Sequence, residues 1–176
     1  PSKKLLAAVH AAWPAAIHLP AVQRVAKPAQ WRIWRMPLYP PLGTLEEPES
    51  PKAYRLWRAV FFTSEQTRVR GMHLRTLWIQ KGEEKLGRPL TSGELAEIRA
   101  EDRRYRLEEV AKRLAPLHGM ATVARSLQRL VEAATTKFPE YGWKWDLHLN
   151  NMAVDGHGNL ILLDPLVGVP PMPLAL

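Results

Sequence analysis

The sequence predicts an α+β domain, in which a small, partly stranded N-terminal portion precedes a mainly helical portion that carries a β-hairpin. Three observations lead to this prediction. Short segments between residues 22 and 36 alternate in polarity, as strands do. Apolar residues recur at spacings of three and four over much of residues 51–138, as in amphipathic helices. Two short apolar runs after residue 151 flank a turn-forming segment.

The N-terminal portion is rich in proline, which limits the length of any regular element there. Residues 3–13 are rich in alanine and leucine and predict a helix that Pro14 ends. Residues 22–25 and 31–36 alternate in side-chain character and predict two short strands. Residues 37–51 hold five prolines and three glutamates, so they predict a loop.

The first long helix is predicted to begin at Ser50-Pro51. Serine is a favoured N-cap, and proline suits the first helical position because its missing N–H has no partner there in any case. Apolar side chains then recur at helical spacing, and we expect Gly71 to interrupt the helix because glycine is a weak helix former. Residues 82–89 are charged and contain glycine, and they predict a connection.

Two further helices follow this connection. Thr91 and Glu94 have the spacing of a capping box, so a helix is predicted to start there and to run to Pro116. A second amphipathic helix is predicted over about residues 121–138. The tryptophan and leucine stripes of these helices predict a hydrophobic core. The length of 176 residues suits one domain, 1–176.

Composition excludes several classes of site. The chain has no cysteine, so disulfides, thiolate metal sites and cysteine nucleophiles are excluded. No run of about 18 apolar residues occurs, so we expect no membrane-spanning helix and a cytoplasmic location. The formal net charge is +8, and residues 1–80 alone hold 12 basic and 4 acidic residues. This basic half favours an anionic partner, either an acidic protein or a nucleic acid, unless its charges simply form solvated helix faces.

The segment after Pro139 carries the chemistry. If residues 152–154 pair antiparallel with residues 160–163, the open ends of this hairpin are Asn151 and Asp164. Asp146 lies five residues before Asn151, on the loop that leads into the same end. The pattern therefore predicts that three oxygen-bearing side chains converge at the mouth of the hairpin.

Two carboxylates and an amide suit a hard cation such as Mg²⁺, which prefers oxygen ligands and keeps waters or substrate phosphates in its shell. Asp146 would then be free to orient a nucleophilic hydroxyl or accept its proton. The spacing matches the phosphotransfer arrangement in which an aspartate is followed five residues later by a metal-binding asparagine, and by a second metal-binding aspartate after a hairpin.

The runs DLHLNN at 146–151 and LILLDP at 160–165 resemble the catalytic and metal-binding segment of the protein-kinase-like superfamily. The Asp-Leu-His sequence is similar to that of aminoglycoside phosphotransferases. The Asp-Pro ending is similar to the early serine/threonine protein kinases of short-tailed bacteriophages. The resemblance covers residues 143–165, about an eighth of the chain.

This resemblance implies an ATP- and Mg²⁺-dependent phosphotransferase that acts on a protein hydroxyl, as a phage protein directed at host machinery. Asp146 would be the catalytic aspartate, and Asn151 and Asp164 the Mg²⁺ ligands. Arg35 would stand where the nucleotide-binding lysine is expected, and His148, which we expect to brace the loop by hydrogen bonds, is the other candidate for nucleotide binding. Residues 1–50 would form a reduced N-terminal lobe and residues 51–176 a helical lobe.

The sequence also departs from the kinase pattern. No glycine occurs before residue 43, so the glycine-rich phosphate-covering loop is absent or replaced. No Val-Ala-Ile-Lys strand occurs, and the planar guanidinium of Arg35 is not equivalent to a lysine ammonium. We therefore expect a minimal or degenerate kinase-like fold.

Three alternatives stay open. The chain could be a catalytically dead, pseudokinase-like protein that grips an acidic host protein or a nucleic acid through its basic half. It could be a plain nucleic-acid binder, with the cluster Trp31, Arg32, Trp34 and Arg35 stacking on bases and contacting phosphates. Asp146 and Asp164 could also be structural, one as a loop cap and the other at a strand end. The oligomeric state is not predicted.

Overall fold

The computed structural model describes residues 5, 9, 18–20, 23–25, 33–35, 37–43 and 49–169 of the chain. These residues form an α+β fold with three long helices and three small antiparallel sheets, which confirms the predicted class. The elements are β1 (Gln23–Val25), β2 (Ile33–Arg35), α2 (Pro51–Leu86), α3 (Ser92–Leu114), α4 (Ala121–Lys137), β3 (Gly142–Trp145), the 3-10 turn η1 (Leu149–Asn151), β4 (Met152–Val154), β5 (Leu160–Leu162) and β6 (Leu166–Val169).

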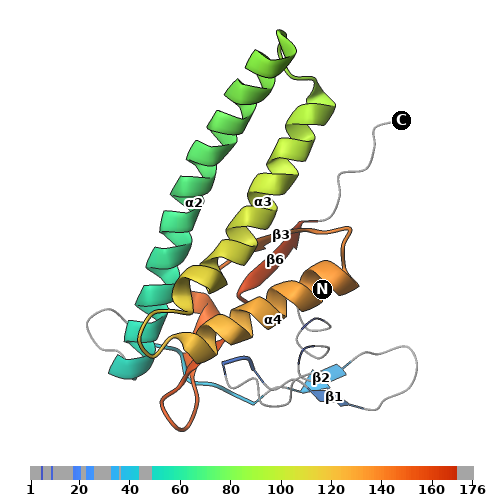
Figure 1. Ribbon diagram of the computed structural model, residues 1–176. Helices are drawn as coiled ribbons and strands as arrows, with labels where there is room; N and C mark the ends of the chain where they lie inside the picture. Colours follow the sequence, from blue (N-terminus) through green and yellow to red (C-terminus); the bar gives the residue numbers. More distant parts are fainter. Residues whose placement is uncertain are drawn as a thin grey trace.

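Helices α2 and α3 lie side by side as a long antiparallel hairpin (Figure 1). Both begin at the caps that the sequence predicts. The Ser50 Oγ accepts a hydrogen bond from the Ala53 N–H at 3.2 Å, and Thr91 and Glu94 form a reciprocal capping box. Helix α2 ends at Gly87, whose φ of 64° is the left-handed conformation that favours glycine at a helix C-terminus.

The prediction that Gly71 interrupts the first helix is wrong. Helix α2 continues through Gly71 to Leu86, so the predicted connection at 82–89 is also shorter than expected. Gly71 is buried against α3, and a Cβ there would lie 2.6 Å from the Asp102 Oδ1 and 2.8 Å from the Arg106 Nε. The glycine is needed for close helix packing, which outweighs its low helix propensity of about 1 kcal/mol.

The carboxylate beside Gly71 belongs to a buried ion-pair cluster between the two helices. The Asp102 side chain is almost fully buried and accepts hydrogen bonds from Arg106, one turn further along α3. The Arg75 guanidinium reaches the same carboxylate from α2 at 3.7 Å. Two cations thus compensate the burial of one carboxylate, as a buried charge requires.

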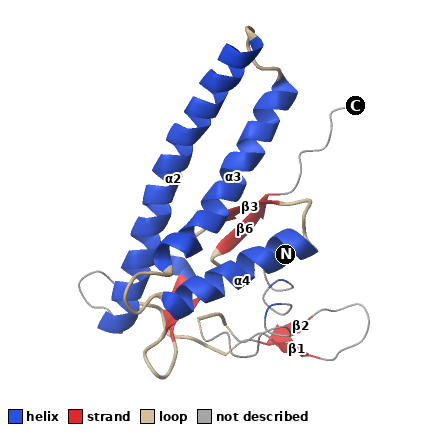
Figure 2. Ribbon diagram, in the orientation of Figure 1, coloured by secondary structure: helices blue, strands red, loops and turns tan. Residues whose placement is uncertain are grey.

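Helix α4 packs beside α3 and closes the hydrophobic core (Figure 1). Its buried face holds Val123, Leu127, Leu130 and Val131, at the helical spacing that the sequence predicts. The core continues from this face into the hairpin strands β4 and β5, whose six residues are all buried. The strands lie in the half of the molecule away from the α2–α3 turn (Figure 2).

The predicted hairpin is confirmed, because β4 pairs antiparallel with β5 with Met152 opposite Leu162 and Val154 opposite Leu160. Segments from the N-terminal portion close both of its edges. The Val154 N–H donates to the Pro40 carbonyl at 3.0 Å on one side, and the Leu162 N–H donates to the His18 carbonyl at 2.9 Å on the other. Neither edge of this short sheet is left open at those positions.

The other predicted N-terminal elements are confirmed in part. The predicted strands 22–25 and 31–36 contain the observed β1 and β2, which pair antiparallel with each other. Leu5 and Val9 are helical and buried, and the rest of the predicted helix 3–13 lies outside the described residues. Among the helices that the structure describes, none combines the length and the apolar character needed to cross a membrane.

We predict that Gly71→Val destabilises the protein by about 2–3 kcal/mol, because a branched side chain has to displace the buried Asp102–Arg106 pair. Urea unfolding followed by circular dichroism measures the change in the free energy of unfolding. The matched control is Gly93→Val in the first turn of α3, where a Cβ meets no atom closer than 4.0 Å. The control should stay within about 0.5 kcal/mol of wild type; equal losses in both variants would contradict the packing role of Gly71.

Candidate functional site

The candidate site is the mouth of the β4–β5 hairpin. Asp146 follows β3, Asn151 closes the turn η1 just before β4, and Asp164 lies two residues after β5. Each of the three therefore lies at or just after the end of a short element. Asp146 and Asn151 are half-buried, and Asp164 is exposed.

Two backbone hydrogen bonds hold these residues together. The Leu163 N–H donates to the Asn151 carbonyl at 2.8 Å and extends the hairpin pairing by one step. The Asp146 N–H donates to the Pro165 carbonyl at 2.9 Å and joins β3 to the start of β6. Asp164 lies between the two residues that make these bonds, so its backbone is held next to both Asp146 and Asn151.

A third hydrogen bond orients the Asn151 side chain. Its Nδ2 donates to the Asp146 main-chain carbonyl at 3.0 Å across the loop. An asparagine amide has a donor end and an acceptor end, and the donor end is used here. The Oδ1 is therefore the end that can serve a cation.

The donor set fits Mg²⁺ in its chemistry. Carboxylate and amide oxygens are hard ligands, and Mg²⁺ commonly takes only one or two protein carboxylates and fills its remaining positions with water and phosphate oxygens. No group of three or more His, Asp or Glu side chains suited to a metal occurs among the described residues. The set at the hairpin mouth contains two aspartates and an asparagine, so a cation held there would need further ligands from water or from a bound molecule.

His148 lies beside Asp146, with its Nε2 3.5 Å from the Asp146 Oδ1. This distance is longer than that of a typical hydrogen bond, and the imidazole is 77% exposed. The expected bracing of the loop instead comes from the main chain, where the His148 carbonyl accepts from the Asn151 N–H at 2.9 Å. The imidazole itself remains available to a ligand at the mouth.

Arg35 lies in β2, opposite Gln23 of β1. The side chain of Arg35 lies outside the part of the chain that the structure describes. The chain continues from β2 into residues 37–43, where Pro40 and Pro41 pair with β4. Arg35 is therefore only a few residues along the chain from the segment that pairs with the hairpin.

Two indole groups fasten the loop to the helices. The Trp57 Nε1 of α2 donates to the Leu147 carbonyl at 3.1 Å, and the Leu147 side chain is buried in the core. The Trp145 Nε1 donates to the Arg106 carbonyl of α3 at 3.2 Å. Asp146 and His148 thus flank a residue that is fixed by both packing and hydrogen bonding.

Sequence reasoning missed these two tryptophans. Trp57 belongs to an apolar stripe that predicts only core, and Trp145 lies in a short aromatic run before the loop. A buried indole N–H usually needs a hydrogen-bond acceptor. That requirement is the one signal in the sequence that could have predicted hydrogen bonds from these tryptophans. The sequence could not have said which carbonyl each indole reaches.

The turn of the hairpin is organised by Asp155. Its carboxylate accepts from the His157 N–H at 2.9 Å and from the main-chain N–H and the side-chain amide of Asn159 at 2.8 and 3.0 Å. Desolvation raises the pKa of Asp155, but the hydrogen bonds outweigh it and lower the pKa below its usual value. This carboxylate shapes the turn and lies at the opposite end of β4 and β5 from the mouth.

The N-terminus of α2 holds the same turn in place. The Ser50 Oγ donates to the Gly158 carbonyl at 2.9 Å, and the Lys52 Nζ lies 3.3 Å from the Asn159 Oδ1. Ser50 therefore has two roles, since its oxygen also caps the helix. Helix α2 contacts the hairpin at its turn through Ser50 and beside its mouth through Trp57.

No known protein family, curated protein or solved structure matches this chain.

We predict that Trp57→Phe destabilises the protein by about 1–3 kcal/mol, because the variant keeps an aromatic ring but leaves the Leu147 carbonyl without its donor. Hydrogen exchange of the Asn151 amide should also become faster as the loop loosens. Trp78→Phe is the control, since Trp78 lies on the half-exposed part of the same helix. Unchanged stability and exchange in Trp57→Phe would show that the indole does not fasten the loop.

We also predict that the protein loses stability as the pH falls below about 6.5, the ordinary pKa of histidine. His18 is buried, with its Nδ1 2.7 Å from the Leu160 carbonyl, and burial lowers its pKa; nearby Lys52 adds to this, while the Leu160 carbonyl and Asp155 oppose it. The unfolded state then binds a proton at a higher pH than the folded state, so acid favours unfolding.

Thermal unfolding between pH 8 and pH 5 tests this prediction, with His18→Gln as the variant and the exposed His118→Gln as the control. The decline between about pH 6.5 and 5 should be smaller in His18→Gln than in wild type and unchanged in His118→Gln. A decline of the same size in all three proteins would assign the acid sensitivity to other groups.

Proposed function

We propose that the chain is an ATP- and Mg²⁺-dependent, kinase-like phosphotransferase that acts on a protein hydroxyl, with its active site at the hairpin mouth. The observation that carries this proposal is the set of three hydrogen bonds that brings Asp146, Asn151 and Asp164 together. Phosphoryl transfer asks for positioning and charge neutralisation more than for covalent chemistry by the protein, and such a fixed set of oxygen groups can supply both.

In this proposal Asp164 and the Asn151 Oδ1 would hold Mg²⁺, which would bind the phosphates of ATP. The cation would neutralise charge on the phosphate oxygens. The Asp146 carboxylate orients the acceptor hydroxyl. As the oxygen–phosphorus bond to the acceptor forms, the bond to the bridging oxygen of ADP breaks, and the hydroxyl proton passes to Asp146. His148 stands close enough to Asp146 to hold its carboxylate in place or to contact a phosphate.

The proposed kinase-like arrangement assigns residues 1–50 to a reduced N-terminal lobe and residues 51–176 to a helical lobe. The pairing of Pro40 and Pro41 with β4 supports this, because it brings the N-terminal portion against the hairpin that bears the site. Arg35 would then bind phosphate in place of the nucleotide-binding lysine of kinases. The long α2–α3 hairpin is an elaboration that the kinase resemblance does not account for.

A second candidate is a pseudokinase-like protein that has no catalytic activity and acts by binding. It would be a phage protein that binds and modulates a host protein or a nucleic acid in the host cytoplasm. The observation that favours it is the exposed surface of α2, which carries both arginines and large apolar side chains. The two candidates differ in whether the hairpin mouth binds a nucleotide.

We predict that ATP with Mg²⁺ raises the Tm of the wild-type protein, by about 5–10 °C at a ligand concentration a hundred times the Kd. Asp164→Asn should lose this shift because it removes a carboxylate ligand. Asp155→Asn is the matched control, since it makes the same change in the same hairpin; it should lower the Tm and keep the shift. Absence of any Mg²⁺-dependent shift in wild type would reject the phosphotransferase and favour the binding protein.

Transfer itself is tested with Asp146→Asn, which should keep the shift caused by Mg²⁺ and ATP but lose at least about 100-fold in phosphate transfer to dephosphorylated casein, a generic hydroxyl-bearing acceptor. Transfer measured with radiolabelled ATP reports this loss. A nucleotide-dependent shift without transfer in wild type would favour the pseudokinase-like protein.

A further inference from the structure

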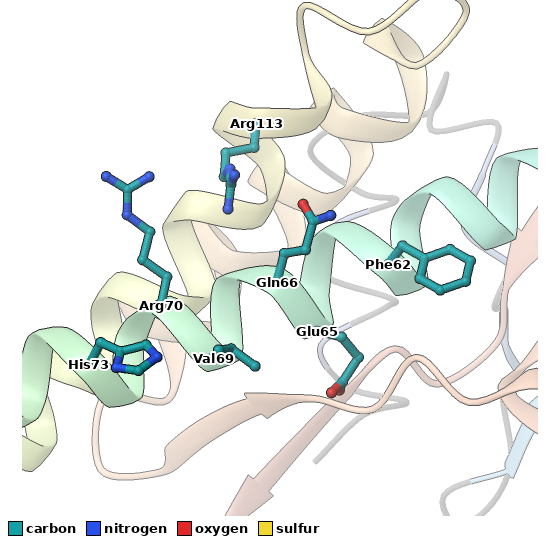
Figure 3. A pocket seen from close by; sticks show the side chains of 7 residues that line it. All are labelled: Phe62, Glu65, Gln66, Val69, Arg70, His73 and Arg113. Atoms are coloured by element: carbon teal, nitrogen blue, oxygen red, sulfur yellow. The ribbon is translucent and has the colours of Figure 1, made fainter.

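A shallow pocket lies on α2, well away in the sequence from the residues of the hairpin mouth (Figure 3). It has a volume of about 500 Å³ and is lined by Phe62, Glu65, Gln66, Val69, Arg70 and His73 of α2, together with Arg113 of α3. Its lining spans three turns of α2, which is the length of a short helical or extended peptide segment. The shape suits a segment of another protein better than a small molecule, which prefers an enclosed site.

The floor of this pocket is more apolar than a solvated helix face requires. Phe62 is 52% exposed and Val69 is 46% exposed, and Met72 and Leu77 continue the exposed apolar side chains along α2. Single exposed apolar side chains are common, but Phe62 and Val69 are two helical turns apart on the same face of α2 and together form an apolar patch in the pocket, of the kind that marks an interaction site. The Arg58 guanidinium lies 5.6 Å from the centre of the Phe62 ring and adds a cation to the edge of the patch.

The charges around the pocket are unevenly distributed. Glu65 is already paired with Arg68 at 2.8 Å. Arg70 and Arg113 form no salt bridge with any other residue that the structure describes. In Figure 3 these two arginines lie on the side of α2 next to α3, and Glu65 lies on the opposite edge. An anionic group would therefore meet two uncompensated guanidinium groups beside an apolar floor.

We infer that this surface docks an acidic amphipathic helical segment of a partner protein. Its apolar residues would cover Phe62 and Val69, and its carboxylates would pair with Arg70 and Arg113, which can each bind a carboxylate bidentately. The combination of apolar floor and cationic rim is the complement of such a segment. The inference does not depend on the proposed phosphotransfer, since no residue of the hairpin mouth contributes to the surface.

The test uses a fluorescent synthetic peptide of about 18 residues, with Leu and Phe on one helical face and Glu on the other. Fluorescence anisotropy should show that the peptide binds the wild-type chain. Its affinity for the double variant Arg70→Glu/Arg113→Glu should be at least about tenfold lower. A peptide with Gln in place of every Glu should also bind at least about tenfold more weakly. Affinity for the acidic peptide should fall as NaCl rises from about 50 to 500 mM.

Two variants separate charge from fold and from apolar contact. Arg99→Glu/Arg125→Glu makes the same charge change at exposed arginines of α3 and α4 outside the pocket, and should bind like wild type. Val69→Asp should weaken binding through the apolar floor. Circular dichroism confirms that all variants keep wild-type helicity.

Several outcomes would overturn the inference. They are the absence of peptide binding at concentrations up to about 1 mM, equal binding by the two arginine double variants, and equal binding of the Glu and Gln peptides. Sedimentation that shows a wild-type dimer lost in Val69→Asp would make a second copy of this chain the occupant instead. Binding of a single-stranded oligonucleotide that outcompetes the peptide, and that Arg70→Glu/Arg113→Glu abolishes, would make the surface a nucleic-acid site.

Discussion

The hydrogen bond from the Trp57 indole to the Leu147 carbonyl joins the helical part of the molecule to the loop that bears Asp146. The loop is held through its backbone, through the Asn151 side-chain amide that donates to the Asp146 carbonyl, and through one buried residue, Leu147, which packs into the core. The arrangement leaves the carboxylate of Asp146 and the imidazole of His148 partly or largely exposed while the chain between them is held.

The same principle extends to the two sheets around the site. The pairing of β3 with β6 and of β4 with β5 ends in the backbone bonds from Asp146 to Pro165 and from Leu163 to Asn151. The first bond joins the loop after β3 to the start of β6, and the second joins the end of β5 to the turn before β4. A shift of either sheet would therefore move the site residues together. The buried Asp102 cluster and the close approach at Gly71 fix α2 against α3, and these helices in turn hold the two indole groups.

Local signals predicted the start of each long element well. Ser50 and Thr91 cap their helices as expected because capping depends on residues within one turn of chain. The hairpin was predictable because its turn residues and apolar runs are close in sequence, and its register then placed Asn151 and Asp164 at one end. The prediction of a break at Gly71 was wrong because the role of this glycine depends on contact with α3, which no local sequence pattern predicts. The edges of the hairpin are closed by His18 and Pro40, which lie far from it in the sequence, so no local pattern could predict that closure.

The sequence alone was sufficient to determine the α+β class, the helix caps and the set of residues that meet at the hairpin mouth, because each depends on spacings within a few tens of residues. Only the tertiary structure decided which backbone groups hold that set, which indole reaches which carbonyl, and that the Asn151 amide turns its nitrogen toward Asp146. It also decided where the basic charge is used, since Arg75 and Arg106 are paired at the buried Asp102, whereas Arg70 and Arg113 line an exposed surface. Pairing and burial depend on contacts between distant segments, and a count of charges along the chain contains no information about those contacts.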